Sequence, residues 1–352
     1  MTIMPPTSAV SPNLSKLRFY SIRFASIAVL LLAMALGVYF YLQSATSHDL
    51  YTGAIEKVRI GNVGEHTIFN LIAQDRGYFS EQGLDTNITE YPSGPASMAA
   101  LLDGKEDISI AAEFVGVRNI FTNPDIRILA QVNSNRVFQV AVRAADIAAP
   151  TDLAGKRIGV TQNSAGEYFL GALLVANNVE LSSVTLVNQT PAEMLQGIED
   201  GTVDAVVLFD PYIYNLKKKQ GDAIRLFDLQ YKQYNNALAY STQRYLDAHP
   251  TVAVRYLRAL VEAEQYYHTH TAEAQVLVAQ KLGLDPEYQG YVKSKVTNEL
   301  ALDQALIINM ESEARWSIQK KLTDQTVVPN YLSYIYGDAL QTVKPDSISL
   351  IR

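Results

Sequence analysis

The sequence contains no cysteine among its 352 residues. Disulfides, thiolate metal sites, a cysteine nucleophile and the lipid-bearing cysteine of a bacterial lipoprotein are therefore excluded. Charged residues are also few, at 18% of the chain, whereas hydrophobic residues make up 48%, enough for one large core or two smaller ones. The five histidines are scattered, so we expect no metal site. The sequence also lacks the G-x-S-x-G, Walker A and G-x-G-x-x-G motifs.

Basic residues flank the one long hydrophobic run on its N-terminal side only, since none follows it until Lys57. Phe24–Leu42 is uncharged over 19 residues, which at 1.5 Å per residue can just cross a hydrocarbon core of roughly 30 Å. Three basic residues and no acidic ones precede it, namely Lys16, Arg18 and Arg23. The positive-inside rule then leaves residues 1–23 in the cytoplasm and exports everything after residue 42. Because the run is long, we expect an uncleaved anchor rather than a cleaved signal, although Ala45–Ser47 is a passable cleavage site.

The exported part of the chain is acidic. Residues 1–42 carry a charge of +3. Because the whole chain carries −7, the remainder carries −10. This balance argues against a nucleic-acid partner and against a polybasic membrane-surface role. The basic run Lys217–Lys219 has no interleaved aromatic residues that could stack on bases, so we interpret it as a solvated face.

The pattern after the polar tether of residues 43–56 indicates two lobes. The predicted first lobe comprises residues 57–143 and 243–352, and the second comprises residues 144–242. Valine- and isoleucine-rich strands alternate with helical patterns, which favours parallel sheets covered by helices. Strands are expected at residues 57–62, 86–91, 107–112, 126–132, 137–143, 156–161, 184–187, 203–209, 223–227 and 237–242. Helices are expected at residues 67–78, 274–282, 286–295 and 302–322.

Two strands are expected to join the lobes. Val137–Arg143 is β-like and precedes an alanine- and proline-containing stretch, which we interpret as the crossing into the second lobe. Ala237–Thr242 has the pattern of a strand that returns to the first lobe. The chain after this strand is predicted to be helical.

An internal repeat indicates that the lobes are similar. The segment LLDGKEDISIAAE at residues 101–113 matches the phrase that ends in GTVDAVVLFDPY at residue 212. The matched positions are Asp103-Gly104 with Asp200-Gly201, Asp107 with Asp204, and Glu113 with Asp210. In both copies a glycine turn, an aspartate and an apolar strand end in an acid. We predict that these acids face each other across a ligand cleft; solvated or helix-capping acids are the alternative.

Strand-to-helix turns offer further ligand contacts. Ser164–Glu167 has the S-x-x-E spacing of a capping box directly after a strand, where ligands bind in open α/β sheets. An ordinary helix cap is the alternative, and we assign that role to Thr190–Glu193. The corresponding turn of the first half, residues 61–67, has two glycines and the polar residues Glu65, His66 and Thr67.

Four phrases resemble a known family. They are AQDRGYFSEQGLD from residue 73, LLDGKEDISIAAE from residue 101, DLAGKRIGV from residue 152 and GTVDAVVLFDPY from residue 201. They are similar to phrases of the extracytoplasmic solute-binding proteins of ABC importers, in the nitrate/sulfonate/taurine and thiamine-precursor (NMT1/THI5-like) group. The resemblance spans about residues 57–274.

The resemblance implies an α/β, bilobal periplasmic-binding-protein-like (type II) fold, with two α/β lobes joined by two crossing strands and preceded here by one N-terminal transmembrane helix. Helix N-termini near Ser93 and Ser164 would engage acceptor or anionic groups. Glu113 and Asp210 would engage donor groups, which makes simple anions less favourable ligands. The ligand-binding residues expected by position are Glu65, His66, Thr67, Ser93, Gly94, Glu113, Asn163, Ser164, Ala165 and Asp210.

The expected function is the solute-binding component of an ABC importer, which binds a small polar nitrogen- or sulfur-containing solute by hinge closure. Its expected partners are the small-molecule ligand, an ABC permease with its ATPase, and the membrane through the N-terminal helix. We expect a monomer without cofactor on the periplasmic or extracellular face of the inner membrane. Two alternatives are a pyrimidine- or metabolite-processing enzyme of the same fold and a membrane-tethered ligand sensor. The enzyme alternative is weakened because the cysteine-rich signature of the yeast-type pyrimidine-synthesising enzymes is missing.

Overall fold

The computed structural model describes residues 51–230 and 233–351 together with Met34, except for the side chains of Glu65 and Thr67. Residues 51–352 form one compact unit. Among the described residues, no helix combines the length and apolar character needed to span a bilayer. The predicted anchor Phe24–Leu42 falls outside the described residues, apart from Met34.

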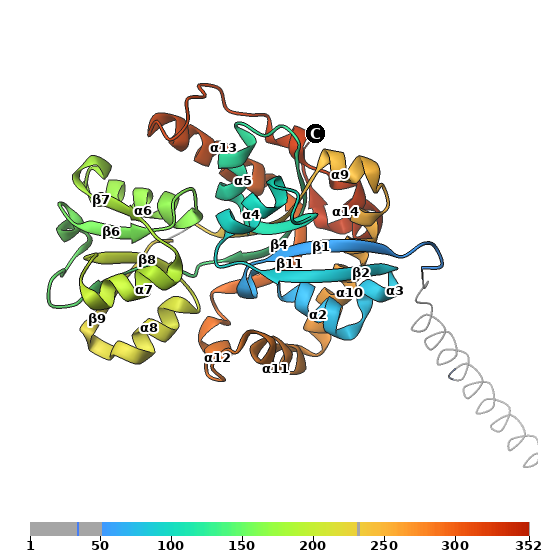
Figure 1. The fold of residues 1–352 in the computed structure, drawn as a ribbon, viewed down its shortest axis with the longest axis horizontal. Coiled ribbons are helices and arrows are strands. Elements are labelled where there is room, and N and C mark those ends of the chain that lie inside the picture. Colours follow the sequence, from blue (N-terminus) through green and yellow to red (C-terminus); the bar gives the residue numbers. More distant parts are fainter. Residues whose placement is uncertain (1–33, 35–50, 231–232, 352) are drawn as a thin grey trace, which may run out of the picture. The chain divides into compact units, whose positions relative to one another are not determined.

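The first lobe is built on a seven-stranded sheet in the order β12-β11-β4-β10-β3-β1-β2 (Figure 1). Its central strands are rich in isoleucine and valine because helices cover both faces, and Val58, Ile60, Ile108 and Ile110 are fully buried. The strands are β1 (Glu56–Asn62), β2 (Leu84–Glu90), β3 (Ile108–Ala112), β4 (Ile126–Asn135), β10 (Asn235–Thr242), β11 (Val296–Asp303) and β12 (Ile348–Ser349).

Helices of the first lobe pack on this sheet and on one another. The longest, α10 (Val252–Thr269), buries Tyr256, Leu257 and Leu260 at helical spacing against α2 (Ile68–Arg76) and the sheet. The other helices are η1 (Gly64–Thr67), α3 (Tyr78–Glu81), α4 (Gly94–Leu102), α5 (Glu113–Ile120), α9 (Gln243–Ala248), α11 (Thr271–Leu282), α12 (Tyr288–Val292), α13 (Gln304–Gln319), η5 (Tyr331–Tyr334), α14 (Gly337–Val343) and η6 (Pro345–Ser347).

The second lobe has a five-stranded sheet in the order β7-β6-β8-β5-β9, with an apolar core on each face. Its strands are β5 (Phe138–Arg143), β6 (Arg157–Val160), β7 (Thr185–Asn188), β8 (Ala205–Phe209) and β9 (Ile224–Asp228). Its helices are η2 (Pro150–Leu153), α6 (Ala165–Ala176), η3 (Leu181–Ser183), α7 (Pro191–Asp200), α8 (Tyr212–Gln220) and η4 (Gly221–Ala223). The predicted bilobal α/β architecture is thus confirmed.

The structure moves both lobe boundaries and changes the predicted strand directions. β5 pairs in the second sheet and β10 in the first, so the chain crosses before residue 138 and before residue 235, not at residues 143 and 242. The sheets are mixed rather than parallel, because β10 runs antiparallel to β3 and β5 runs antiparallel to β8. The reason is geometric: β3 and β8 end at the inter-lobe edge, whereas a strand arriving directly from the other lobe must start there.

β11 was not predicted: residues 296–301 lie between the helices expected at 286–295 and 302–322, and residues 302 and 303 fall in the second of these helices. The flanking helices α12 and α13 are accordingly shorter than expected. Leucine, alanine and glutamate favour helix in isolation, but pairing with β4 overrides that preference here. Alternate side chains of β11 are buried, namely Asn298, Leu300 and Leu302.

The repeated aspartates have a structural role at the sheet edge away from the crossings. Asp107 accepts hydrogen bonds from the backbone N–H of Arg59 (2.9 Å) and from its guanidinium (2.5 Å). Asp204 makes the same contacts with Arg157, at 2.8 Å to the backbone N–H and 2.9 Å to the guanidinium. In the first lobe these hydrogen bonds join the turn before β3 to β1, and in the second lobe they join the turn before β8 to β6.

Buried polar groups join the two crossing segments. The Gln230 carboxamide accepts a hydrogen bond from the N–H of Phe138 (2.8 Å) and donates one to the carbonyl of Asn135 (3.0 Å). Gln230 is completely buried, and these two partners belong to the first crossing. The two crossings are therefore held together as one hinge.

A second contact between the lobes surrounds Trp316, the one tryptophan of the sequence. Its indole, on α13, is perpendicular to the ring of Tyr168 on α6, with the ring centroids 5.2 Å apart. The indole also covers Gly171 so closely that an added Cβ there would lie 2.3 Å from Cζ2 of Trp316. Only a glycine at this position lets α6 approach α13 as it does.

Candidate functional site

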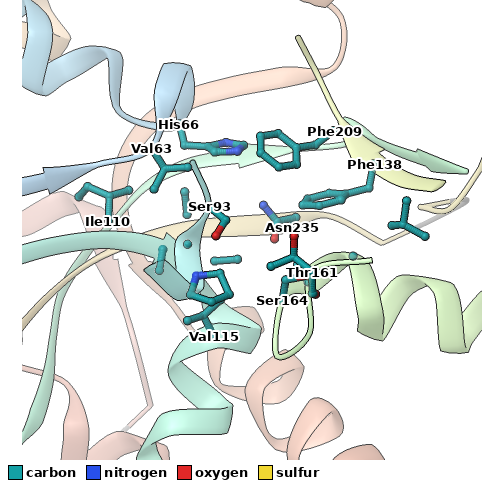
Figure 2. Close-up of a pocket in the computed structure, with 18 of the residues that line it drawn as sticks. Val63, His66, Ser93, Ile110, Val115, Phe138, Thr161, Ser164, Phe209 and Asn235 are labelled. Atoms are coloured by element: carbon teal, nitrogen blue, oxygen red, sulfur yellow. The ribbon is translucent and has the colours of Figure 1, made fainter. Parts of the chain in front are cut away.

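A pocket lies between the lobes, where β3 and β8 end and β5 and β10 begin (Figure 2). The space between its walls, including the part that is open to solvent, measures about 550 Å³. The first lobe contributes Val63, His66, Ser93, Gly94, Pro95, Ile110, Ala111, Ala112, Val115, Asn235 and Ala237. The second lobe contributes Phe138, Thr161, Ser164, Ala165, Gly166, Met194, Val207 and Phe209.

The N-terminus of α4 faces this pocket from the first lobe. Ser93 is its N-cap residue, but the hydroxyl does not cap the helix and instead faces the pocket (Figure 2). The next residue, Gly94, lies against β3, since an added Cβ would be 3.3 Å from the Cβ of Ala111. The absence of a side chain brings the first turn of the helix close to the pocket.

The N-terminus of α6 faces the pocket from the second lobe, but the predicted capping box at Ser164 is not formed. The Ser164 hydroxyl donates a hydrogen bond to the carbonyl of Thr161 (2.6 Å), and Glu167 accepts one from the N–H of Asn163 (2.8 Å). By contrast, Thr190 and Glu193 form the predicted capping box of α7 outside this pocket. The first N–H groups of α6 therefore have no side-chain cap at the pocket.

Two helix N-termini from opposite lobes thus converge on one small space. Their unpaired N–H groups and positive dipole ends favour an anion. Among the described side chains around the pocket there is no Asp, Glu, Lys or Arg, so the helix ends supply the positive potential in this part of the structure. Asn235 adds a hydrogen-bond acceptor, because its buried Oδ1 has no partner among the described residues, and this atom suits a donor group on the ligand. The helix N-termini suit an anionic group that is rich in acceptors.

His66 contacts the other lobe across the pocket. Its ring centroid is 5.5 Å from that of Phe209, and its Nδ1 lies 3.4 Å from Nδ2 of Asn135 (Figure 2). Burial lowers the pKa of His66 to about 4, because the charged imidazolium would lose its water. The imidazole is therefore neutral at physiological pH, and the electropositive character of the pocket comes from the helix ends.

Comparison with known proteins identifies the family of this chain. Residues 64–274, more than half of the chain, match the family described as NMT1/THI5 like. The chain belongs to the NMT1/THI5-like family. A member of similar length in Bacillus subtilis (strain 168), named "Putative aliphatic sulfonates-binding protein", is 24% identical over 295 residues, which cover 78% of this chain and 86% of that protein.

Solved structures share the fold of this family member at lower identity. The alkanesulfonate-binding protein SsuA of Xanthomonas axonopodis pv. citri, bound to MOPS, has a TM-score of 0.69 at 19% identity, covering 81% of this chain and all 100% of SsuA. The desulfurization enzyme DSZB has a TM-score of 0.62 at 15% identity, covering 83% and 99% of the two chains. The fold therefore occurs in both binding proteins and an enzyme.

Glu113, one of the two predicted cleft acids, does not line the pocket of this NMT1/THI5-like protein. It opens α5 and is buried, with its carboxyl group accepting hydrogen bonds from the backbone N–H and the side-chain amide of Asn236. Burial raises its pKa, and the nearby Glu313 is raised likewise by burial and by the charge of Glu113. Glu113 thus anchors the start of β10.

Asp210, the other predicted cleft acid, is also occupied by partners of its own chain. Its carboxylate lies 3.0 Å from the ammonium of Lys295 and accepts a hydrogen bond from the N–H of Tyr214 (3.2 Å). Burial raises its pKa, and the charge of Lys295 opposes that shift. The pair links the second lobe to the residue before β11. The two predicted acids therefore do not face each other across a ligand. The argument that they make anionic ligands less favourable is corrected as well.

The other predicted residues divide between the pocket and its border. His66, Ser93, Gly94, Ser164 and Ala165 surround the pocket. Asn163 lies outside it, where its Oδ1 accepts a hydrogen bond from Arg118 of the first lobe (3.2 Å). The side chains of Glu65 and Thr67 are outside the described part of the structure.

Sequence reasoning missed the aromatic wall and the amide of the pocket. Phe138 and Phe209 begin and end strands of the second sheet, and Asn235 begins β10. A signal existed in the crossing strands themselves, because any residue at a crossing must lie at the inter-lobe edge. The first residues of both crossing strands were therefore candidates.

Proposed function

We propose that this protein is the solute-binding component of an ABC importer and that it binds a small organic anion, most favourably a sulfonate, between its lobes. The observation that carries the proposal is the convergence of the α4 and α6 N-termini on an uncharged pocket. A sulfonate has one negative charge spread over three acceptor oxygens, which matches several N–H donors without a cationic side chain. The names of the Bacillus relative and of SsuA support the same class.

Binding and closure would be coupled through the two helix N-termini that begin after Ser93 and Ser164. Ser93 belongs to the first lobe and Ser164 to the second, so a ligand that contacts both makes its full set of hydrogen bonds only when the lobes are closed. Such a ligand biases the population toward the closed form by its difference in affinity for the two forms. A permease with its ATPase would then receive the closed, loaded protein.

The proposal extends to the membrane. The apolar run Phe24–Leu42 and the basic residues before it support an N-terminal anchor that holds a monomer on the outer side of the inner membrane. Fractionation of cells tests this: the protein should stay with the membrane after alkaline washing. A protein released in shortened form would instead indicate a cleaved signal.

Calorimetry of the purified protein tests the ligand class. Ethanesulfonate should bind, whereas the Ser93→Ala variant should bind it about tenfold more weakly, the effect of losing one hydrogen bond to a charged group. Thr190→Ala is the matched control, since it removes a helix-capping hydroxyl outside the pocket and should leave affinity unchanged. Absence of binding by sulfonates, nitrate and amino-pyrimidines alike would contradict the proposal.

A binding role rather than catalysis is part of the proposal, and the shared fold of DSZB makes it worth testing. Bound sulfonate should be recovered unchanged after prolonged incubation with the protein, as judged by mass spectrometry. Release of sulfite or a desulfurised product at a rate proportional to protein concentration would favour the enzyme alternative. Ligand uptake by cells that depends on the gene would separate transport from sensing.

A further inference from the structure

A second compartment borders the inter-lobe pocket. It is surrounded by residues of both lobes, including Tyr91 and Pro92 of the first lobe and Pro211 and Tyr212 of the second. Three residues, Val63, His66 and Phe209, surround both compartments. We refer to the pocket at the helix N-termini as the inner compartment and to this second space as the outer compartment.

Aromatic rings run along the second lobe from one compartment to the other. Phe138 lines the inner compartment, and its ring centroid is 5.5 Å from that of Phe209. Phe209 in turn lies 5.3 Å from Tyr212 of the outer compartment, with the two rings perpendicular. The row presents apolar ring surface throughout, so an aromatic group could pack against it in either compartment.

The boundary between the compartments is the contact of His66 with Phe209. These rings come from different lobes and are tilted by 41°. Both are half-buried side chains, and His66 is uncharged at neutral pH because burial lowers its pKa to about 4. A solute can separate two such rings without breaking an ion pair.

The outer compartment offers a ring-shaped group few competing charges. Asp210, the one acid among the described residues that surround it, is buried and paired with Lys295. Tyr91 is held in place because its hydroxyl donates a hydrogen bond to Glu106 (2.8 Å). Tyr212, from the second lobe, is half-buried and its ring is perpendicular to that of Phe209. A flat apolar group between these tyrosines would be covered on two sides.

We propose that the natural solute carries an aromatic ring attached through a short linker to its anionic head, and that this ring occupies the outer compartment. The inference rests on the proposed function, because the head is placed in the inner compartment by the helix N-termini. It narrows the ligand from organic anions in general to arylalkyl anions. The linker would pass between His66 and Phe209.

Calorimetry with two kinds of sulfonate tests the inference. The probes are ethanesulfonate and a series of phenylalkanesulfonates of increasing linker length. At least one phenyl compound should bind about tenfold more tightly than ethanesulfonate. Tyr212→Ala should reduce the affinity for that compound by roughly three- to tenfold, the range of a lost aromatic contact. It should change the affinity for ethanesulfonate by less than twofold, and Tyr212→Phe should restore the phenyl preference because it keeps the ring.

The outcomes separate this inference from the proposed function. If ethanesulfonate binds but no phenyl compound gains affinity, the inference is wrong while the sulfonate site stands. Equal losses for both probes in Tyr212→Ala would also overturn it, since they would indicate damage to the inner compartment. If neither probe binds the wild-type protein, the proposed function itself fails.

Discussion

At the scale of single residues, the most unusual chemistry lies beside the pocket rather than in it. Glu113 and Glu313 are both about 1% exposed, and one carboxylate oxygen of Glu313 has no hydrogen-bond partner among the described residues. Burial, together with the charge of Glu113, raises the pKa of Glu313, so at neutral pH the pair retains at least one proton. Around Glu313 the buried hydroxyls of Ser317 and Tyr331 likewise have no partner in this part of the structure.

This pair should make stability fall at alkaline pH. Because folding raises both pKa values above the ordinary 4.5, the folded state holds these protons more tightly than the unfolded state. The stabilisation is therefore complete below about pH 4.5 and is lost as the pH rises through the raised values. Glu313→Gln removes one titrating group. We expect it to raise the free energy of unfolding at about pH 9 by roughly 1–3 kcal/mol, the usual cost of a buried polar group without a partner.

Urea denaturation at about pH 5 and pH 9 measures this effect. At the lower pH the variant should differ from wild type by about 0.5 kcal/mol or less, as is usual for mild substitutions. Glu311→Gln is the control, because Glu311 lies on the same helix but is half-exposed and paired with Arg315. An equal gain at both pH values would show that titration of Glu313 is not the cause.

The predicted site residues also show how much of the site could be predicted from the sequence. Ser93 and Ser164 could be predicted because a helix start directly after a strand is a local signal. The roles of Glu113 and Asp210 could not, because their partners Asn236 and Lys295 are 123 and 85 positions away along the chain. An acid at the end of a strand is the same in sequence whether it meets a ligand or a buried amide.

At the scale of elements, the two crossing segments determine both the fold and the pocket. Alternating β and α patterns in the sequence predict the strands of both sheets, apart from β11 and the short β12. Strand order and direction could not be predicted, because they depend on where each strand enters its sheet. β5 and β10 enter at the inter-lobe edge, which makes the sheets mixed and places Phe138 and Asn235 in the pocket.

The hinge should lose stability when its buried amide is removed. Gln230→Met keeps the approximate volume of the side chain but leaves the N–H of Phe138 and the carbonyl of Asn135 without their partner. Since each buried unpaired group costs about 1–3 kcal/mol, we expect a loss of roughly 2–4 kcal/mol in the free energy of unfolding. Chemical denaturation followed by circular dichroism gives this value.

The matched control for the hinge is Gln325→Met, which replaces an exposed glutamine with the same side chain. It should change stability by about 0.5 kcal/mol or less. If Gln230→Met is equally mild, the crossings are held by their strands alone. The carboxamide of Gln230 would then have no structural role.

At the scale of the whole molecule, the contacts between the lobes include the ligand pocket, the pair of Asp210 with Lys295, and the contact of Trp316 with α6. We expect the pocket and the Trp316 contact to form together when the lobes close. Gly171→Ala should therefore weaken ethanesulfonate binding about tenfold, since the added methyl group would overlap the indole and hold the lobes apart. Isothermal calorimetry measures the loss, and small-angle scattering of the loaded variant should show a larger radius of gyration than wild type.

Gly290→Ala is the control for this substitution. Gly290 is exposed in α12, has no neighbouring atom within 4 Å of an added Cβ, and gains up to about 1 kcal/mol in helix propensity. Its affinity for ethanesulfonate should match that of wild type. Undiminished binding by Gly171→Ala would mean that the Trp316 contact is not part of the loaded state.

Trp316 also gives the protein an optical signal of its own. The sequence has no other tryptophan, so emission excited at the red edge of absorption comes from this one indole. In the closed arrangement the indole is packed against Phe114 and Tyr168, and its Nε1 has no hydrogen-bond partner among the described residues. Opening of the lobes would admit water to the indole and shift its emission to longer wavelength. Candidate solutes can therefore be ranked by fluorescence titration of the unlabelled wild-type protein.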